Sequence, residues 1–313
     1  MKLSRIIFMG TPEFAVPSLK KLVEQNYKPL LCITQPDKPK GRKKKLLPTE
    51  VKIKAIKHNI PILQPININD EDVINEISKY NPELIITVAY GGYIGKKLRK
   101  MPKFGIINLH PSLLPKYRGS SPINYPLFNG DEYTGNTIFK IVSKMDAGPI
   151  IYQSKIKIEK DDNYTKLSSK LAKFGAKEII TVIKMFEEDK ADFIKQDETS
   201  VSYTQKIEKK DLYLDWNMPA KRINNKVRGL AEKPAVSTSY KNKQLKIIET
   251  EILESKSSKK PGTVVNIEKK IGIVVATQDF DILIKKVQPA GKKIMDAYAF
   301  YLGARIMPNE ILG

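Results

Sequence analysis

The stretch LIITVA at residues 84–89 limits the possible folds of this chain more than any other feature. A strand with one face in water alternates apolar and polar residues, whereas this run is apolar almost throughout. Such runs are typical of strands that are buried on both faces of a parallel sheet. Parallel strands need a crossover connection, which is usually a helix. The run therefore predicts an α/β domain with helices on both sides of its sheet.

The segments around this run alternate as that fold requires. Residues 5–10 (RIIFMG) form an apolar run that ends at a glycine, and apolar residues then recur at helical spacing as far as Val23. Further strands are predicted at residues 29–33 and 60–63, and helices at residues 49–58 and 70–80. This order predicts a Rossmann-like, doubly wound domain. The turn at Gly10 lacks the G-x-G-x-x-G spacing, so we expect no nicotinamide cofactor.

A polar pair ends another apolar run, GIINLH, at residues 105–110. Strand side chains alternate between faces, so Asn108 and His110 point into the same space. Pro111 ends the strand and places the pair at the carboxyl edge of the sheet, where such folds bind ligands. An amide can donate to an oxyanion, and an imidazole with a reference pKa of about 6.5 can move a proton near neutrality. The pair is compatible with acyl transfer, but by itself it more often indicates a histidine that caps the strand and an asparagine that serves a turn.

Longer motifs extend this pair. The chain continues as NLHPSLLP at residues 108–115 and YRG at 117–119, and MDAGPI follows at residues 145–150. Other motifs are MGTPEFA at residues 9–15, QPD at 35–37 with Gly41 and Arg42, and VQPAGK at 287–292. With these motifs the chain resembles the folate-dependent formyltransferases over essentially its whole length. Within that superfamily it is most similar to the branch that acts on methionyl-tRNA.

The resemblance implies a catalytic site and a reaction. Asn108 would hold the oxyanion, His110 would handle the proton, and Asp146 would orient the histidine. An aspartate before Ala-Gly-Pro is by itself ordinary turn chemistry. The implied folate-binding motif consists of Ser112, Leu113, Leu114 and Pro115. The expected reaction moves the formyl group of 10-formyltetrahydrofolate to the α-amino group of methionyl initiator tRNA, which gives formylmethionyl-tRNA for translation initiation.

An excess of positive charge favours a polyanionic partner. Lys and Arg number 55 against 34 Asp and Glu, a net charge of +21. Nucleic acid is the natural candidate, although a lysine-rich composition alone would give the same excess. Residues 35–45 form a basic loop, which is either a solvated turn or a phosphate-binding segment. The resemblance favours contact with tRNA through Arg42, Lys43, Lys44 and Lys45.

A second domain follows a polar stretch near residue 190. Apolar residues at helical spacing predict a long helix at residues 163–189 that closes the first domain. We expect a formyltransferase catalytic domain at residues 1–189, a linker at 190–206 and a tRNA-binding domain at 207–313. A helix at residues 219–230 and short strands beyond it suggest a small, OB-like β-barrel.

Other features exclude some classes of protein. The single cysteine, Cys32, lies in an apolar run and indicates a buried residue in a reducing compartment. With 2 histidines, His58 and His110, we expect no metal site. No membrane span is predicted, so we expect a cytoplasmic protein, and we expect a monomer. Two alternatives remain: another folate-dependent formyltransferase with a ribonucleotide or amino-sugar acceptor, and a non-catalytic RNA-binding protein.

Overall fold

The computed structural model describes residues 2–40 and 45–313, which divide into two compact units. Unit 1 comprises Met1–Pro122, Tyr133–Lys157 and Ser168–Thr204, and unit 2 comprises Ile123–Glu132, Ile158–Leu167 and Gln205–Gly313. The segment expected as a linker therefore belongs to unit 1 as far as Thr204. The division of roles expected at residues 189 and 207 stays a prediction.

The described residues of unit 1 form a seven-stranded sheet in the order β10-β9-β7-β6-β1-β2-β5. Five of its strands are parallel: β1 (Ile6–Gly10), β2 (Leu31–Ile33), β5 (Ile62–Leu63), β6 (Leu84–Val88) and β7 (Ile106–His110). β9 (Tyr133–Lys140) pairs antiparallel with β7, and the edge strand β10 (Ile150–Lys157) pairs antiparallel with β9. The predicted Rossmann-like α/β fold is confirmed. The antiparallel pairing of β9 was not expected; β10 runs antiparallel to β9 because a short connection joins the two strands as a hairpin.

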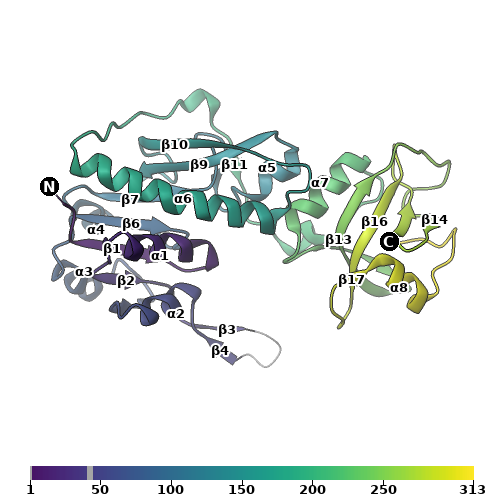
Figure 1. Cartoon of the computed structure of the whole chain (residues 1–313), viewed down its shortest axis with the longest axis horizontal. Helices are drawn as coiled ribbons and strands as arrows, with labels where there is room; N and C mark the ends of the chain where they lie inside the picture. Colours follow the sequence, from purple (N-terminus) through teal and green to yellow (C-terminus); the bar gives the residue numbers. More distant parts are fainter. Residues whose placement is uncertain (1, 41–44) are drawn as a thin grey trace. The chain divides into compact units, whose positions relative to one another are not determined.

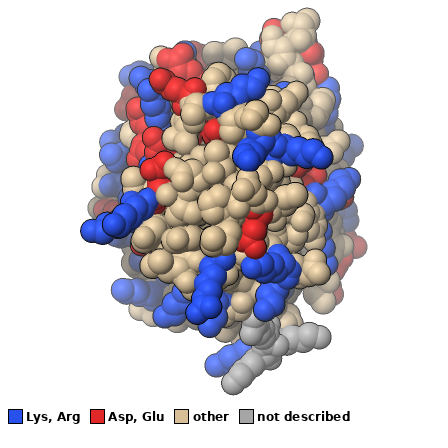
Figure 2. Space-filling view, turned by 90° about the vertical axis from the view of Figure 1, so that its right-hand side faces the viewer, with Lys and Arg blue, Asp and Glu red and all other residues tan. Residues whose placement is uncertain are grey.

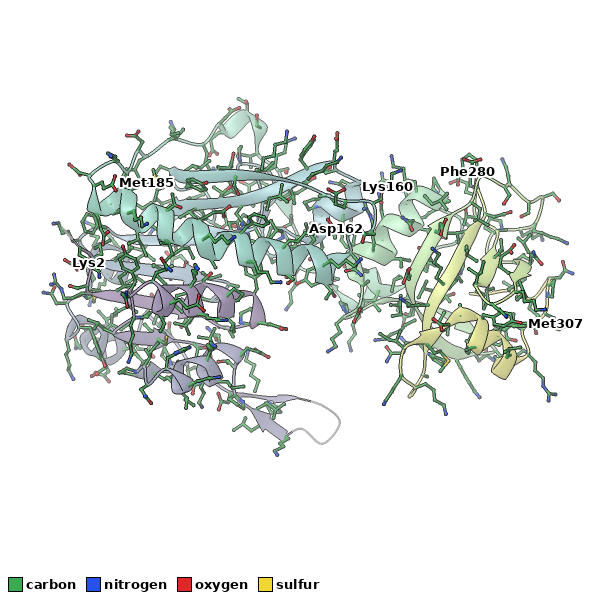
Figure 3. All side chains as sticks on the ribbon, in the orientation of Figure 1. Lys2, Lys160, Asp162, Met185, Phe280 and Met307 are labelled. Carbon is green, nitrogen blue, oxygen red and sulfur yellow. The ribbon has the colours of Figure 1, made fainter. Side chains whose placement is uncertain are left out.

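Helices cover both faces of this sheet (Figure 1). One face packs against α1 (Val16–Glu24), α2 (Glu50–Lys57) and α6 (Tyr164–Glu187), and the other against α3 (Glu71–Ser78) and α4 (Lys96–Lys100). Each face of the sheet has its own hydrophobic core, which we call the first core (beneath α1, α2 and α6) and the second core (beneath α3 and α4). Ile86 belongs to the first core and Ile85 to the second, as the alternation of strand side chains requires. Met185, labelled in Figure 3, is one of the residues by which α6 packs onto the first core. All residues of β6 are buried, which confirms the interpretation of the run for residues 84–88, whereas Ala89 follows the strand and is exposed.

The direction of winding reverses between β1 and β6. The chain proceeds from β1 through β2 to β5 on one side, and returns to β6 and β7 on the other. Such a reversal opens a crevice at the carboxyl ends of the strands. Gly10 ends β1 at this place, and a β-carbon there would lie 2.8 Å from that of Ala15 and 3.0 Å from the carbonyl oxygen of Val88. Close packing therefore explains Gly10 without a dinucleotide.

Two short pairs of strands in unit 1 were not expected. The basic loop contains an antiparallel pair, β3 (Lys38–Lys40) and β4 (Lys45–Leu47), whose polar sequence gives no strand pattern. The second pair is parallel and joins β8 (Arg118–Gly119) to β11 (Tyr203–Thr204). It links the central motif to the segment that was expected to be a linker.

Unit 2 contains a small antiparallel β domain. Its strands are β12 (Val236–Tyr240), β13 (Lys243–Ile252), β16 (Ile282–Pro289), β15 (Gly272–Val275) and β14 (Val264–Glu268), in that spatial order, with β17 (Met295–Asp296) beside β16. The helices of unit 2 include α5 (Asn124–Asn129), α7 (Ala220–Leu230) and α8 (Ala297–Ala304). The C-terminal backbone connects the two ends of this strand order, because Leu312 N donates to Gly262 O and Gly313 N to Ser239 O. The expected small β domain is confirmed.

Two single residues, Trp216 and Cys32, are buried in the cores, the second as predicted. Trp216 is buried in the core of unit 2, and its Nε1 donates to Thr238 Oγ1 at 3.1 Å, so it is a core anchor. Cys32 is a buried free thiol whose pKa is raised to about 12 by burial. Among the described residues, no group of His, Cys, Asp and Glu is arranged to hold a metal ion. Within the same residues, no helix combines the length and apolar character needed to cross a membrane.

Candidate active site

Strand β7 carries the polar pair on one face. Its other face, at Ile107 and Leu109, packs into the core beneath α6. Asn108 and His110 therefore point away from α6, as alternation requires. β7 pairs with β6 on one side and β9 on the other, so its backbone is held along both edges. The two side chains project from a rigid support at the end of the strand.

Thr87 orients the amide of Asn108. It lies directly across from Asn108 in the β6–β7 register, and its hydroxyl donates to Asn108 Oδ1 at 2.7 Å. This bond identifies Oδ1 as the atom that faces Thr87, so Nδ2, which carries both amide hydrogens, points to the other side. Within the described part of the chain, Nδ2 makes no hydrogen bond. Asn108 thus presents a neutral donor that suits an oxygen on which negative charge develops.

The ring of His110 has one nitrogen with a fixed role. Nε2 lies 2.9 Å from the carbonyl oxygen of Tyr117. Because a carbonyl oxygen only accepts hydrogen bonds, Nε2 carries a hydrogen whether the ring is neutral or charged. Nδ1 is therefore the atom that gains and loses a proton. The ring is buried, with Phe139 edge-on to it at 6.4 Å between ring centroids.

Asp146 faces this nitrogen from the loop between β9 and β10. Its Oδ2 lies 3.9 Å from His110 Nδ1, which is too long for a direct hydrogen bond. The same oxygen accepts a hydrogen bond from Gly119 N at 2.8 Å. At this separation the carboxylate lies within ion-pair distance of Nδ1 without a direct hydrogen bond to it. Asn108, His110 and Asp146 therefore lie at the same end of β7, and their catalytic roles stay a prediction.

The backbone of the Asp146 loop adopts a conformation that side chains disfavour. Asp146 has a φ of 51°, in the left-handed region, which costs about 1–3 kcal/mol for a residue other than glycine. Gly148 lies so close to β9 that an added β-carbon would be 1.7 Å from Lys140 O. Such a loop persists only where its surroundings hold it.

The residues expected to bind folate form the turn after β7. Ser112 is buried, and its hydroxyl donates to Lys116 O at 2.7 Å. Leu114 is buried as well, and its N–H donates to Thr137 Oγ1 at 3.1 Å. Leu113 and Pro115 are half-buried. Ser112 and Leu114 thus shape the turn, and the binding of folate by this motif stays a prediction.

The basic loop is anchored at its base. Asp37 accepts hydrogen bonds from Lys52 Nζ at 2.6 Å and from Gln64 Nε2 at 2.7 Å. The bonds from Gln64 and then Lys52 lower the pKa of Asp37. Lys45 is exposed at the start of β4. Arg42, Lys43 and Lys44 lie outside the described residues, so their role in binding tRNA stays a prediction.

Known proteins match this chain along nearly its whole length. The family Formyl transferase matches residues 4–183, and the family Formyl transferase, C-terminal domain matches residues 206–305. A protein from Bacillus velezensis, named methionyl-tRNA formyltransferase, is 39% identical over 312 residues, which are 99% of this chain and 98% of that protein. One of the same name from Thermodesulfovibrio yellowstonii is 43% identical over 304 residues, 97% of each chain. The chain belongs to the methionyl-tRNA formyltransferase family.

Solved structures share the fold at lower identity. The sugar 3N-formyl transferase WlaRD, solved with dTDP and 5-N-formyl-THF, superposes with a TM-score of 0.64 at 21% identity, covering 94% of this chain and 100% of that one. HypX from Aquifex aeolicus, in complex with tetrahydrofolic acid, gives 0.65 at 15% identity over 96% of this chain and 47% of its own. At identities this low, the similarity to the two solved structures shows only that this chain shares their fold.

Two residues near the site, Thr87 and Gln196, carry no recognised motif in the sequence. Thr87 reads as an ordinary strand residue, although it is the one hydroxyl in an otherwise apolar run next to β7. Gln196 hydrogen-bonds the Asp146 loop from a segment with no motif. For Thr87, the polar residue within an apolar run was a usable signal. For Gln196 we find no signal in the sequence.

Proposed function

We propose that this chain transfers the formyl group of 10-formyltetrahydrofolate to the α-amino group of methionyl initiator tRNA. The observation that carries the proposal is the grouping of Asn108, His110 and Asp146 at the end of β7. The chain is also about 40% identical to proteins named methionyl-tRNA formyltransferase. Initiator methionyl-tRNA and the folate are its substrates. A cytoplasmic location and a monomeric state, expected from the sequence, belong to the same proposal.

In this mechanism the neutral amine attacks the formyl carbon and forms the new C–N bond. Nδ2 of Asn108 stabilises the oxyanion, and Nδ1 of His110 takes the proton that the amine releases. Collapse of the oxyanion breaks the bond to N10 of the folate, and that nitrogen receives the proton. An α-amino group titrates near 7.7–8.0 in reference peptides, so about a tenth or more is neutral at pH 7. The base therefore acts mainly on the proton released after attack.

The choice of acceptor is tested directly. Purified protein is incubated with 10-formyltetrahydrofolate and, in parallel, with charged initiator tRNA, glycinamide ribonucleotide or an amino sugar linked to a nucleotide. We expect formylation of the methionyl-tRNA with kcat/KM far above that of the others. Formylation of the ribonucleotide or the sugar instead would assign the chain to another branch, and binding of tRNA without any formylation would make it an RNA-binding protein.

The basic loop supplies a separate prediction about tRNA. The face drawn in Figure 2 carries scattered Lys and Arg side chains and fewer Asp and Glu. Each basic side chain that contacts a phosphate releases counterions, so log K for tRNA should fall linearly with log salt. Neutralising Lys43, Lys44 and Lys45 should flatten this slope for initiator and elongator tRNA alike.

Arg42→Ala should in addition reduce the preference for initiator tRNA, because a planar guanidinium can also contact base edges. Both variants are checked by measuring kcat/KM for the two tRNAs at two salt concentrations. An unchanged salt slope and an unchanged preference would make the loop a solvated turn.

A further inference from the structure

We propose that Gln196 is a positioning residue of the active site, which sets the place of the Asp146 carboxylate relative to His110. The inference deepens the proposed function and rests on it. Gln196 belongs to the segment between residues 183 and 206, which neither matching family covers. It is nonetheless part of unit 1 and is 4% exposed.

The amide of Gln196 binds the Asp146 loop on both sides of Ala147. Its Nε2 donates to Asp146 O at 2.8 Å and to Gly148 O at 2.7 Å. These bonds use both amide hydrogens. They hold the loop where the left-handed φ of Asp146 needs support.

Arg118 determines which way this amide points. Its guanidinium is 0% exposed and donates to Gln196 Oε1 from Nε at 3.1 Å and from Nη2 at 2.7 Å. A guanidinium only donates, so the atom of Gln196 that faces it must be the oxygen. The nitrogen is thereby directed to the Asp146 loop, and the assignment of the amide does not depend on a choice of rotamer.

A carboxylate completes the surroundings of the buried guanidinium. Glu198 accepts a hydrogen bond from Arg118 Nη2 at 2.8 Å and from Lys144 Nζ at 2.6 Å. Hydrogen bonds from Arg118 and then from Lys144 lower the pKa of Glu198 to about 2. The carboxylate is therefore ionised at neutral pH and pairs with Arg118, as a buried charge requires.

The segment that contains Gln196 also fixes the backbone that binds the Asp146 carboxylate. Asp146 Oδ2 accepts from Gly119 N, and the preceding residue, Arg118, donates its own N–H to Ser202 O at 2.9 Å. Residues 196–204 thus bind both the backbone around Asp146 and the backbone next to its carboxylate. The 3.9 Å between Asp146 Oδ2 and His110 Nδ1 depends on both sets of bonds.

Two substitutions test this role. Gln196→Met keeps the length of the side chain and removes every hydrogen bond, whereas Gln196→Glu keeps an acceptor for Arg118 and removes the two donors. A displacement of about 1 Å can cost about 10²-fold in rate. We expect both variants to lower kcat in single-turnover formyl transfer by about 10- to 100-fold, with little change in KM for either substrate. Their pH–rate profiles should change shape, and we expect the same of Asp146→Asn, whose amide no longer carries the charge.

Asn136→Ala provides a matched control. The amide of Asn136 is buried too, and its Nδ2 donates to Leu171 O at 3.0 Å and to Glu178 Oε2 at 2.9 Å. It faces α6, on the opposite side of the sheet from Asn108. The control should lose thermal stability as the Gln196 variants do, but should keep the wild-type kcat and pH–rate profile.

A readout without substrate separates this inference from the proposed function. The chain has 2 histidines, so ring ¹⁵N spectra of labelled protein are simple, and His58→Gln assigns them. At one fixed pH we expect Gln196→Met to shift the signals of the His110 ring and not those of His58, and Asn136→Ala to shift neither. If Gln196→Met does not fold, Gln196→Glu decides the question.

The outcomes are distinguishable. Wild-type His110 signals and a wild-type pH–rate profile in a folded Gln196 variant would overturn the positioning role. Absence of methionyl-tRNA formylation by the wild-type protein would instead overturn the proposed function, and the spectra would still report whether Gln196 places Asp146.

Discussion

Alanine in place of His110 is expected to slow single-turnover formyl transfer by about 10²- to 10⁴-fold. The structure makes Nδ1 the atom that exchanges a proton, because Nε2 is committed to Tyr117 O. Without the ring, the proton released by the attacking amine has no acceptor in this position. The rate is measured with enzyme in excess over charged tRNA, at saturating 10-formyltetrahydrofolate, across a range of pH.

His58→Ala is the control for this prediction. His58 follows α2 and does not belong to the site, so its loss should leave the rate unchanged. Affinities for folate and tRNA should be close to wild type in His110→Ala, since the proposed role begins only with the chemistry. A His110→Ala variant that transfers formyl groups at the wild-type rate would remove His110 from the mechanism.

Asn108→Ala is expected to lower the rate by about 10²- to 10³-fold, which is typical for the loss of one oxyanion donor. Its free Nδ2 is aimed by the bond from Thr87, so Thr87→Val should cause a smaller loss through the same step. Because the interaction strengthens as charge develops, kcat should fall and the affinity for folate should stay nearly constant. Single-turnover rates and calorimetric folate binding measure the two quantities.

A strand asparagine elsewhere serves as the control for Asn108. Asn266 lies exposed on β14, where Nδ2 bonds Glu268, and Asn266→Ala should leave both quantities unchanged. If Asn108→Ala weakens folate binding as much as it slows the reaction, Asn108 binds the folate substrate and the transition state equally. In that case it does not act specifically on the oxyanion.

Local sequence determined the central strands of the sheet and the strand face that carries Asn108 and His110. The apolar run at residues 84–89 has to be buried on both faces, and β6 is. The spacing of Asn108 and His110 places them on one strand face whatever surrounds them, because the period of a strand is two residues. Pro111 then ends the strand at the edge of the sheet where such folds bind ligands. These features depend on neighbours in the chain and could be predicted from them.

Tertiary structure alone decided how the site is held. The orientation of the Asn108 amide depends on Thr87 in another strand, and the proton on His110 Nε2 depends on the Tyr117 carbonyl. Arg118 meets Gln196 across 78 residues of chain. No periodicity or turn preference encodes such a contact, since it exists only once β8, β11 and the Asp146 loop have packed together. Residues 196–204, which were expected to lie in a linker, therefore support the Asp146 loop and β8 through packing.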